Sequence, residues 1–457
     1  MKKRSWIISI CGIILIGFLG VLFTYRSSAD QSSESTQSNQ RIKITFWHEM
    51  TGPGAAEIQQ FANGFNKEQS KYEIVPEFEG DYNQVIQKVL QTHGTNASPA
   101  LFQSMDVSTG QMRNANITTP VQKFIDQDKY DMSKIMPAAR AFYSKNGQQL
   151  SMPFNTSQPT LFYNKAVFRK YGIKDLPTDP SYDDIEKAAK EIADKSKGAV
   201  KGITVDPYGW YFEEFMANSG QSLANMNDGH DGFPTKVNFT NQATVNAMNW
   251  LQKMNQNGSF ISYGSGSTSA SNEIASFLSG KLGIMFQSSA SMGQLEAASK
   301  PGDLGVTYYP RANGQTANGV AIGGASLWIA NDKDSATQRG AWEFIKYLMQ
   351  PANQAQWQNA TGYIALNKDS QNEPVLKELY KKHPEAQIPS NQLARTKPNS
   401  TNSGILMEGL VQMRTITQNA MQQIYAGRNV NDALKDAQDQ FNSFLTQHNK
   451  ANGYSNK

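Results

Sequence analysis

The strongest constraint on the fold is an alternation of strand and helix patterns between residues 42 and 106. Segments 42–48, 72–78 and 100–106 have the composition of short strands, and Pro76 favours an edge position or an early end for the second. The two segments between them repeat apolar residues at amphipathic helical spacing. Those residues are Ile58, Phe61, Ala62 and Phe65, then Tyr82, Val85, Ile86, Val89 and Leu90. This order predicts a parallel sheet with right-handed crossovers, and therefore an α/β fold.

The chain length indicates two large lobes. Its 457 residues suit two units of roughly 150–200 residues each. A strand-like run returns at 321–329 after a polar, helical middle region, which predicts interleaved lobes. We expect an N-terminal lobe built from 41–155 and 289–345, and a C-terminal lobe built from 156–288 and 346–457. Helices expected toward the C-terminus span 341–348, 352–359, 404–424 and 430–444.

The N-terminal segment predicts that the lobes lie outside the cytoplasm. Residues 1–25 combine a basic start, Lys2-Lys3-Arg4, with a long apolar stretch. One interpretation is a signal peptide cut after Ala29. The other, which we favour, is an uncleaved anchor, because an apolar run of about 18–20 residues can span a bilayer. The basic start holds that end inside under both interpretations. The Ser/Gln-rich residues 26–40 predict a flexible linker.

Composition and motifs argue against several classes of protein. The net charge of +4 is concentrated near the N-terminus, so the remainder is almost neutral and lacks a nucleic-acid footprint. The only cysteine, Cys11, lies in the apolar segment and predicts neither a disulfide nor a thiol site. The five histidines show no paired metal spacing, and neither a serine elbow nor a phosphate loop occurs. Asp228 and Asp231 belong to a Gly-rich segment that we interpret as a solvated turn. We expect no catalytic residue, no metal and no cofactor.

Polar and aromatic residues at element ends fit the lining of a polyol cleft. Ser288 to Ser291 follow an apolar strand and would suit phosphate, although a plain serine N-cap is the simpler interpretation. The Gly323-Gly324 pair inside a strand indicates close approach by a ligand or by another chain segment. Arg414, mid-helix among apolar residues, could bind phosphate bidentately or simply be solvated. Trp210 could stack on ligand carbons or belong to the core. Tyr363 could donate its hydroxyl to a ligand or staple a turn.

A set of motifs extends this pattern over most of residues 42–445. The motifs are Phe46-Trp47-His48, Gly80-Asp81-Tyr82, Pro153-Phe154-Asn155-Thr156-Ser157, Gly323-Gly324-Ala325-Ser326-Leu327-Trp328, Thr361-Gly362-Tyr363 and Gln412-Met413-Arg414. Together they resemble the extracellular solute-binding proteins (family 1) of ABC importers, and most of all the glycerol-3-phosphate-binding branch. The resemblance implies a periplasmic-binding-protein-like fold whose two interleaved lobes, joined by several crossovers, close on the ligand. It places ligand-binding residues at Tyr82, Asp106, Ser157, Trp210, Ser288, Gly324, Tyr363 and Arg414.

Two departures from the family pattern bear on the ligand. Asp106 stands where the family has glutamate, and Pro207 stands where it has a second tryptophan. Losing that ring would open one end of the cleft and make room for a glycerophosphodiester such as glycerophosphocholine besides glycerol-3-phosphate. The aromatics of Phe46-Trp47-His48-Glu49 are expected to shape the cleft floor.

The resulting hypothesis is a substrate-binding subunit that delivers a phosphorylated polyol to an ABC permease. Its partners would be the small-molecule ligand, the transmembrane permease subunits and the membrane itself through the N-terminal segment, with no nucleic acid. We expect a monomer on the outer face of the bacterial cytoplasmic membrane. The alternatives are an oligosaccharide binder of the maltodextrin type and a surface hydrolase, which would need paired carboxylates in the cleft.

Overall fold

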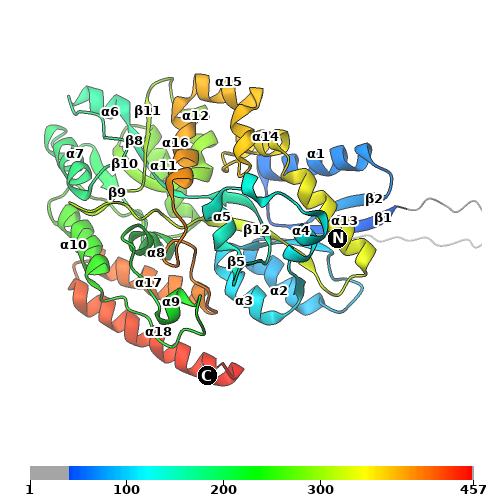
Figure 1. Cartoon of the computed structure of the whole chain (residues 1–457). Coiled ribbons are helices and arrows are strands. Elements are labelled where there is room, and N and C mark those ends of the chain that lie inside the picture. Colours follow the sequence, from blue (N-terminus) through cyan, green and yellow to red (C-terminus); the bar gives the residue numbers. More distant parts are fainter. Residues whose placement is uncertain (1–40, 455–457) are drawn as a thin grey trace, which may run out of the picture. The chain divides into compact units, whose positions relative to one another are not determined.

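The computed structural model describes residues 41–454, and these residues build two main sheets. The predicted signal or anchor (1–25) and linker (26–40) lie outside the described residues. Within 41–454, no helix combines the length and the apolar character needed to cross a membrane. In Figure 1 the first sheet lies on the right with α1, α2 and α13, and the second on the left with α6, α7 and α10.

The first sheet has the strand order β2-β1-β3-β12-β4, and β7 also pairs with β12. Its strands are β1 (Ile42–His48), β2 (Tyr72–Phe78), β3 (Leu101–Met105), β4 (Thr118–Thr119), β7 (Met152–Ser157) and β12 (Gly323–Ala330). β1 runs parallel to both β2 and β3, so the parallel sheet predicted from the alternating pattern is confirmed. β12 is antiparallel to its neighbours. Pro76 lies in the edge strand β2, where a missing backbone N–H donor is tolerated.

The crossover helices of this sheet begin where the sequence supplies start signals. α1 (Gly52–Glu68) has Pro53 in its first turn, and α2 (Tyr82–Thr92) has a capping box of Asp81 and Gln84. Their apolar stripes pack on the sheet together with α13 (Ser335–Leu348) and α14 (Pro351–Thr361). Trp342 and Trp357 are fully buried in the core between these helices and the sheet.

The second sheet has the order β11-β8-β10-β9. Its strands are β8 (Pro159–Asn164), β9 (Lys201–Thr204), β10 (Leu282–Ser288) and β11 (Leu304–Thr307). Surrounding helices are α6 (Lys165–Lys170), α7 (Tyr182–Lys195), α8 (Gly209–Asn218), α10 (Gln242–Gln256), α11 (Ser267–Leu278), α12 (Met292–Ala298), α17 (Leu410–Tyr425) and α18 (Val430–Asn452). Tyr182 and Trp250 stack in the core at 4.3 Å between ring centroids.

Shorter elements complete the described part of the chain. They are α3 (Thr109–Ala115), α4 (Gln122–Asp128), α5 (Pro137–Phe142), β5 (Ser144–Lys145), β6 (Gln148–Gln149), α9 (Asn225–Asp228), α15 (Pro374–Lys382) and α16 (Ile388–Arg395). Five 3₁₀ turns join them, η1 (Asp106–Ser108), η2 (Met132–Lys134), η3 (Ser289–Ser291), η4 (Lys368–Asn372) and η5 (Pro384–Gln387).

The chain passes between the sheets at Gln158, at 308–322 and at 396–409. The buried Gln392 of α16 ties two of these crossovers together. Its amide nitrogen donates to the Pro159 carbonyl at 3.0 Å, and its amide oxygen accepts from the Tyr309 backbone N–H at 2.6 Å. This architecture is the two-lobed α/β fold with several crossovers that the sequence predicted.

The division of the chain between the sheets departs from the predicted lobe boundaries in several places, of which α12, β11 and α14 are examples. Strand β11, at 304–307, pairs with β8 in the second sheet, although 289–345 was expected in the first lobe. Helix α14, expected in the C-terminal lobe, packs on α1 of the first. Hydrophobic pattern alone marks these segments as strand and helix but does not specify which sheet they join. The helix predicted over 404–424 begins only at Leu410, because Gly404 and Gly409 adopt positive φ values.

Candidate ligand-binding site

Most of the predicted ligand residues lie at strand ends or helix starts that face the junction of the two sheets. Asp106 follows β3, Ser157 ends β7, and Ser288 ends β10. Gly323, which begins β12, pairs in register with Ser157, and Gly324 pairs with Thr156. Ligands of open α/β sheets bind at such ends.

The glycine pair is needed because other parts of the chain come very close to it. A Cβ on Gly324, whose φ is +99°, would lie 1.9 Å from the backbone oxygen of Asn155. A Cβ on Gly323 would lie 2.8 Å from Cζ2 of Trp210. The close approach predicted from the sequence is therefore made by a neighbouring strand and by the Trp210 indole.

Trp210 is both a core residue and an edge of the site. Its ring is buried, stacks on Tyr211 with centroids 5.6 Å apart, and packs over Gly323. The indole Nε1–H is shielded from solvent and has no hydrogen-bond acceptor among the described residues. A buried donor in that state is available to a ligand oxygen.

Arg414 is only 12% exposed and is paired, which excludes the solvated helical arginine considered from the sequence. Its Nη2 lies 2.8 Å from Oδ2 of Asp106, across the junction of the two halves. Its Nε and Nη2 lie 2.8 Å from the two carboxylate oxygens of Glu213, one turn into α8. The ring of Tyr208 lies 5.8 Å from the guanidinium carbon and is 41% exposed.

Two carboxylates around one guanidinium leave the group with a formal charge of −1. Burial raises the pKa of Glu213, although Arg414 acts in the opposite direction. Burial alone would lower the pKa of Arg414, but Asp106 and Glu213 more than offset it and hold that pKa above its ordinary value. Arg414 therefore stays charged, and a ligand that contacts it also meets negative charge.

A second polar cluster joins Tyr82, Tyr363 and Asn155. The Asn155 amide nitrogen donates to the Tyr82 hydroxyl at 2.8 Å, and its oxygen accepts from Gln103 at 2.7 Å. Burial, followed by the nearby Tyr363 and Glu49, raises the pKa of Tyr82 well above its ordinary value. Burial also raises the pKa of Tyr363, so both phenols stay protonated.

The first strand contributes differently from what its sequence suggested. Phe46 and Trp47 are buried in separate cores on opposite faces of β1, and the pKa of the buried His48 is lowered to about 4 by burial. The expectation that these aromatics shape the cleft floor is wrong, because strand alternation directs successive side chains to opposite faces. Glu49, just beyond the strand, is the residue that reaches the tyrosine cluster.

Ser288 acts as the N-cap of η3, since its hydroxyl accepts from the Ala290 backbone N–H at 3.2 Å. A plain serine N-cap is the simpler of the two interpretations given above for Ser288 to Ser291. The turn before Tyr363 lies against the same loop, because a Cβ on Gly362 would be 3.1 Å from the Gly293 nitrogen and 3.2 Å from the Ala290 oxygen. Ser288 and Tyr363 thus belong to adjoining segments.

A cavity adjoins Arg414 and extends between the two halves. Its wall includes Asp106 and Phe142 from one half and Trp210, Glu213 and Glu214 from the other. Glu214 is fully buried; one carboxylate oxygen accepts from the Ala321 N–H at 2.8 Å, and the other has no partner within 41–454. Burial raises its pKa well above the ordinary value.

Sequence reasoning missed Glu213, Asn155 and Gln103. Asn155 stood inside a quoted motif, so its neighbourhood was marked, but Glu213 had no signal beyond its place three residues after Trp210. Glu213 becomes significant only because α8 and α17 pack together.

Comparison with known proteins places this geometry in a family. Residues 60–387 match the model of a bacterial extracellular solute-binding protein. Two relatives, both named sn-glycerol-3-phosphate-binding periplasmic protein UgpB, come from Yersinia pseudotuberculosis and Pectobacterium atrosepticum. The first is 30% identical over 400 residues, covering 86% of this chain and 90% of the relative. The second is 31% identical over 416 residues, covering 88% and 91%.

Solved structures share the fold at lower identity. UgpB from Mycobacterium tuberculosis, in complex with glycerophosphocholine, has a TM-score of 0.73 at 18% identity and covers 89% of this chain and 98% of its own. The sugar-binding protein MalE from Xanthomonas citri has a TM-score of 0.77 at 18% identity, with coverages of 91% and 100%. The chain therefore belongs to the bacterial extracellular solute-binding proteins, the non-enzymatic subunits that bind a small molecule on the extracytoplasmic side and work with ABC permease subunits.

Proposed function

We propose that this protein captures a glycerophosphodiester such as glycerophosphocholine, or glycerol-3-phosphate, by closure of its two lobes. The names of the relatives at about 30% identity support the glycerol phosphate class. Asp106 and Tyr82 would take the glycerol hydroxyls, Trp210 would cover the carbon chain, and Ser157 would complete the wall. Arg414, Tyr363, Ser288 and the Gly324 N–H would hold the phosphate through hydrogen bonds, the strongest of them charge-assisted.

The observation that carries the choice within this class is the charge around Arg414. A phosphate monoester is close to doubly charged at neutral pH, whereas a diester carries a single charge. Because Asp106 and Glu213 already surround Arg414, the diester meets less repulsion. A choline group would in addition gain from these carboxylates and from the exposed face of Tyr208.

Pro207 is consistent with this preference. It is buried beside Tyr208, at the position where the family pattern has its second tryptophan. The smaller ring leaves the Tyr208 end of the site to a longer ligand.

By the same proposal the N-terminal segment would tether the protein to the outer face of the membrane, as a monomer.

Calorimetric titration of the purified protein tests the proposal. We expect heat with glycerophosphocholine, weaker binding of glycerol-3-phosphate and none with maltotriose. Arg414→Ala should abolish binding of both phosphorylated ligands, whereas the control Arg169→Ala should bind as the wild type does. Arg169 is a suitable control because its side chain is 59% exposed and pairs with Asp303 within one half. Binding of maltotriose alone, or unchanged affinity in Arg414→Ala, would contradict the proposal.

A further inference from the structure

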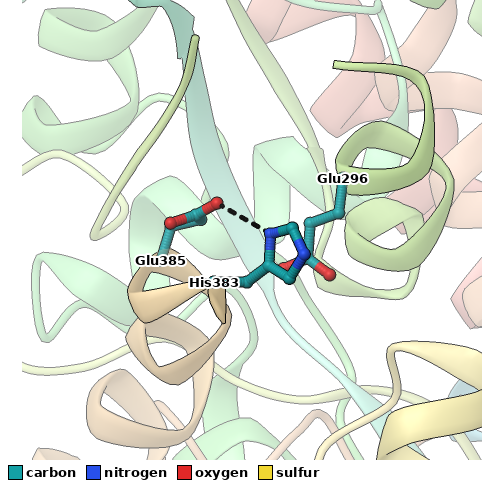
Figure 2. Close-up of side chains that lie close together, drawn as sticks. All are labelled: Glu296, His383 and Glu385. Atoms are coloured by element: carbon teal, nitrogen blue, oxygen red, sulfur yellow. Dashed lines mark ion pairs between the residues drawn. The ribbon is translucent and has the colours of Figure 1, made fainter. Parts of the chain in front are cut away.

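Three side chains with metal-ligating atoms converge away from the ligand site. Glu296 comes from α12, His383 follows the end of α15, and Glu385 lies in η5. One ligand atom of each lies within 4.8 Å of the others. Figure 2 shows the imidazole of His383 between the two carboxylates. The sequence could not indicate this group, because Glu296 is remote from the other two along the chain.

The backbone that presents these side chains is fixed on both sides. Pro384 ends α15, and the His383 N–H still donates to the Leu379 carbonyl at 2.7 Å, so His383 and Glu385 share one tight corner. Leu295, next to Glu296, and Ala386, next to Glu385, are buried in the same hydrophobic cluster. The three side chains therefore extend from anchored segments, as a pre-organised site requires.

The interactions within the group are incomplete. The His383 Nδ1 and Glu385 Oε1 atoms lie 3.5 Å apart, too long for a good hydrogen bond. The Oε1 atom of Glu296 is shielded from solvent and has no hydrogen-bond partner in the described part of the chain. A carboxylate oxygen in such a place needs either a proton or a cation.

We propose that Glu296, His383 and Glu385 form a binding site for a divalent transition-metal ion of the Zn²⁺ type. One imidazole nitrogen and two carboxylate oxygens form a donor set that suits zinc. Ligand atoms at about 2.1 Å from a tetrahedral zinc ion lie about 3.4 Å from one another. The His383–Glu385 separation is already close to that value, and the other ligand atoms lie within 4.8 Å of one another. Ca²⁺ and Mg²⁺ are disfavoured, because they require more ligands, all of them oxygen.

A metal at this position would join two segments that adjoin the ligand site. Helix α12 follows Ser288 and η3, and α15 packs on α14, which leads into Tyr363. The ion would fasten α12 to the corner after α15. We therefore expect zinc to stabilise the folded protein, by an amount that grows with the logarithm of its concentration above the Kd.

The test uses the full chain without a histidine tag, stripped with EDTA and dialysed, then titrated with ZnCl₂. We expect one zinc per chain by calorimetry and by elemental analysis, and a higher Tm in zinc than in EDTA. Glu296→Gln and His383→Asn should each weaken zinc binding at least tenfold. His93→Asn is the matched control, because His93 is a partly exposed histidine whose Nε2 lies 2.8 Å from Oδ1 of Asn331.

Circular dichroism and Tm in EDTA verify that the variants are folded, so a loss of binding reports on the site. Zinc binding that survives in both variants, or no binding by the wild type at millimolar zinc, would overturn the proposal. Loss of binding in His93→Asn as well would show that zinc binds elsewhere on the surface and would equally contradict it.

Discussion

Glu213 determines the charge that a ligand meets at Arg414. It takes two of the hydrogen bonds of the guanidinium and leaves the group with excess negative charge. Under the proposed function, Glu213→Gln removes that charge while it keeps the size of the side chain. Affinity for glycerol-3-phosphate should then rise about tenfold, or ~1.4 kcal/mol, and affinity for glycerophosphocholine should fall. Calorimetry with both ligands measures the change in discrimination.

Glu186→Gln provides the comparison for this variant. Glu186 pairs with Lys253 at 2.6 Å, away from the described site residues. The Glu186→Gln variant should leave the affinity for both ligands unaltered. Equal changes for the two ligands in Glu213→Gln would show that Glu213 positions Arg414 without selecting for charge.

At the scale of single residues, the sequence predicted which residues lie near the site better than it predicted the role of each. It marked Arg414 and Trp210 with two open interpretations each, and the low exposure and ion pairs of Arg414 decide against a solvated arginine. It interpreted Asp228 as part of a solvated turn, but Asp228 is 2% exposed, and its carboxylate accepts from the Ala224 N–H at 2.7 Å. Burial of a polar residue depends on tertiary packing, which a local pattern does not contain.

At the scale of elements, the site depends on the contact between α8 and α17. A Cβ on Gly209 would lie 2.4 Å from the Cα of Arg414, so the two helices meet backbone to backbone. Gly209→Ala should force them apart and lower the free energy of unfolding by about 1–3 kcal/mol. It should also weaken ligand binding, because Arg414 moves with its helix. Urea unfolding and calorimetry measure the two effects.

Gly293→Ala is the control for that change. Gly293 is a helical glycine of α12 with no atom within 4 Å of its would-be Cβ. Alanine there should be neutral or stabilise the protein by roughly 0.5 kcal/mol, since it restricts the unfolded chain. If Gly209→Ala were as benign as Gly293→Ala, the close helix contact would not be a constraint.

Elements with strong periodicity were predicted well, and those defined by long-range pairing were not. The strands 42–48 and 72–78 and the two crossover helices match, because each carries its own apolar period. Strands β4, β5 and β6 have two residues each and leave no period to detect. The membership of β11 in the second sheet follows from its pairing with β8, which only the assembled fold determines.

At the scale of the whole molecule, buried acids make stability depend on pH. Burial raises the pKa of Asp228 from 3.8 to about 6. The folded state therefore holds this proton more tightly than the unfolded state does. The resulting stabilisation is fully present below pH 4 and is lost as pH rises through 6, by roughly 2–3 kcal/mol. Asp228→Asn should flatten this part of the profile, whereas Asp231→Asn, at an exposed position of the same turn, should not. Urea unfolding at pH 4.5, 6 and 7.5 measures this pH dependence of the free energy of unfolding. Parallel pH profiles for the wild type and Asp228→Asn would contradict the prediction.

The contact between Asp106 and Arg414 is a charged link between the half that carries β3 and the half that carries α17. A ligand that binds both residues must replace or share this contact, so the ion pair would favour the closed arrangement before ligand arrives. Asp106→Asn weakens the link but keeps the side-chain size. We expect the ligand-free variant to have a larger radius of gyration in small-angle scattering than the wild type.

Asp303→Asn serves as the reference for this measurement, because it removes the ion pair with Arg169 inside one half. Its radius of gyration should equal that of the wild type. If Asp106→Asn also scatters as the wild type does, the crossovers and the other contacts between the halves, such as that of Lys145 Nζ with the Gly229 carbonyl at 2.9 Å, hold the halves together. The buried Gln392, which joins two crossovers, would then be the residue to change next. An increase confined to Asp106→Asn would instead show that the residue predicted to bind the ligand also holds the two halves together without it.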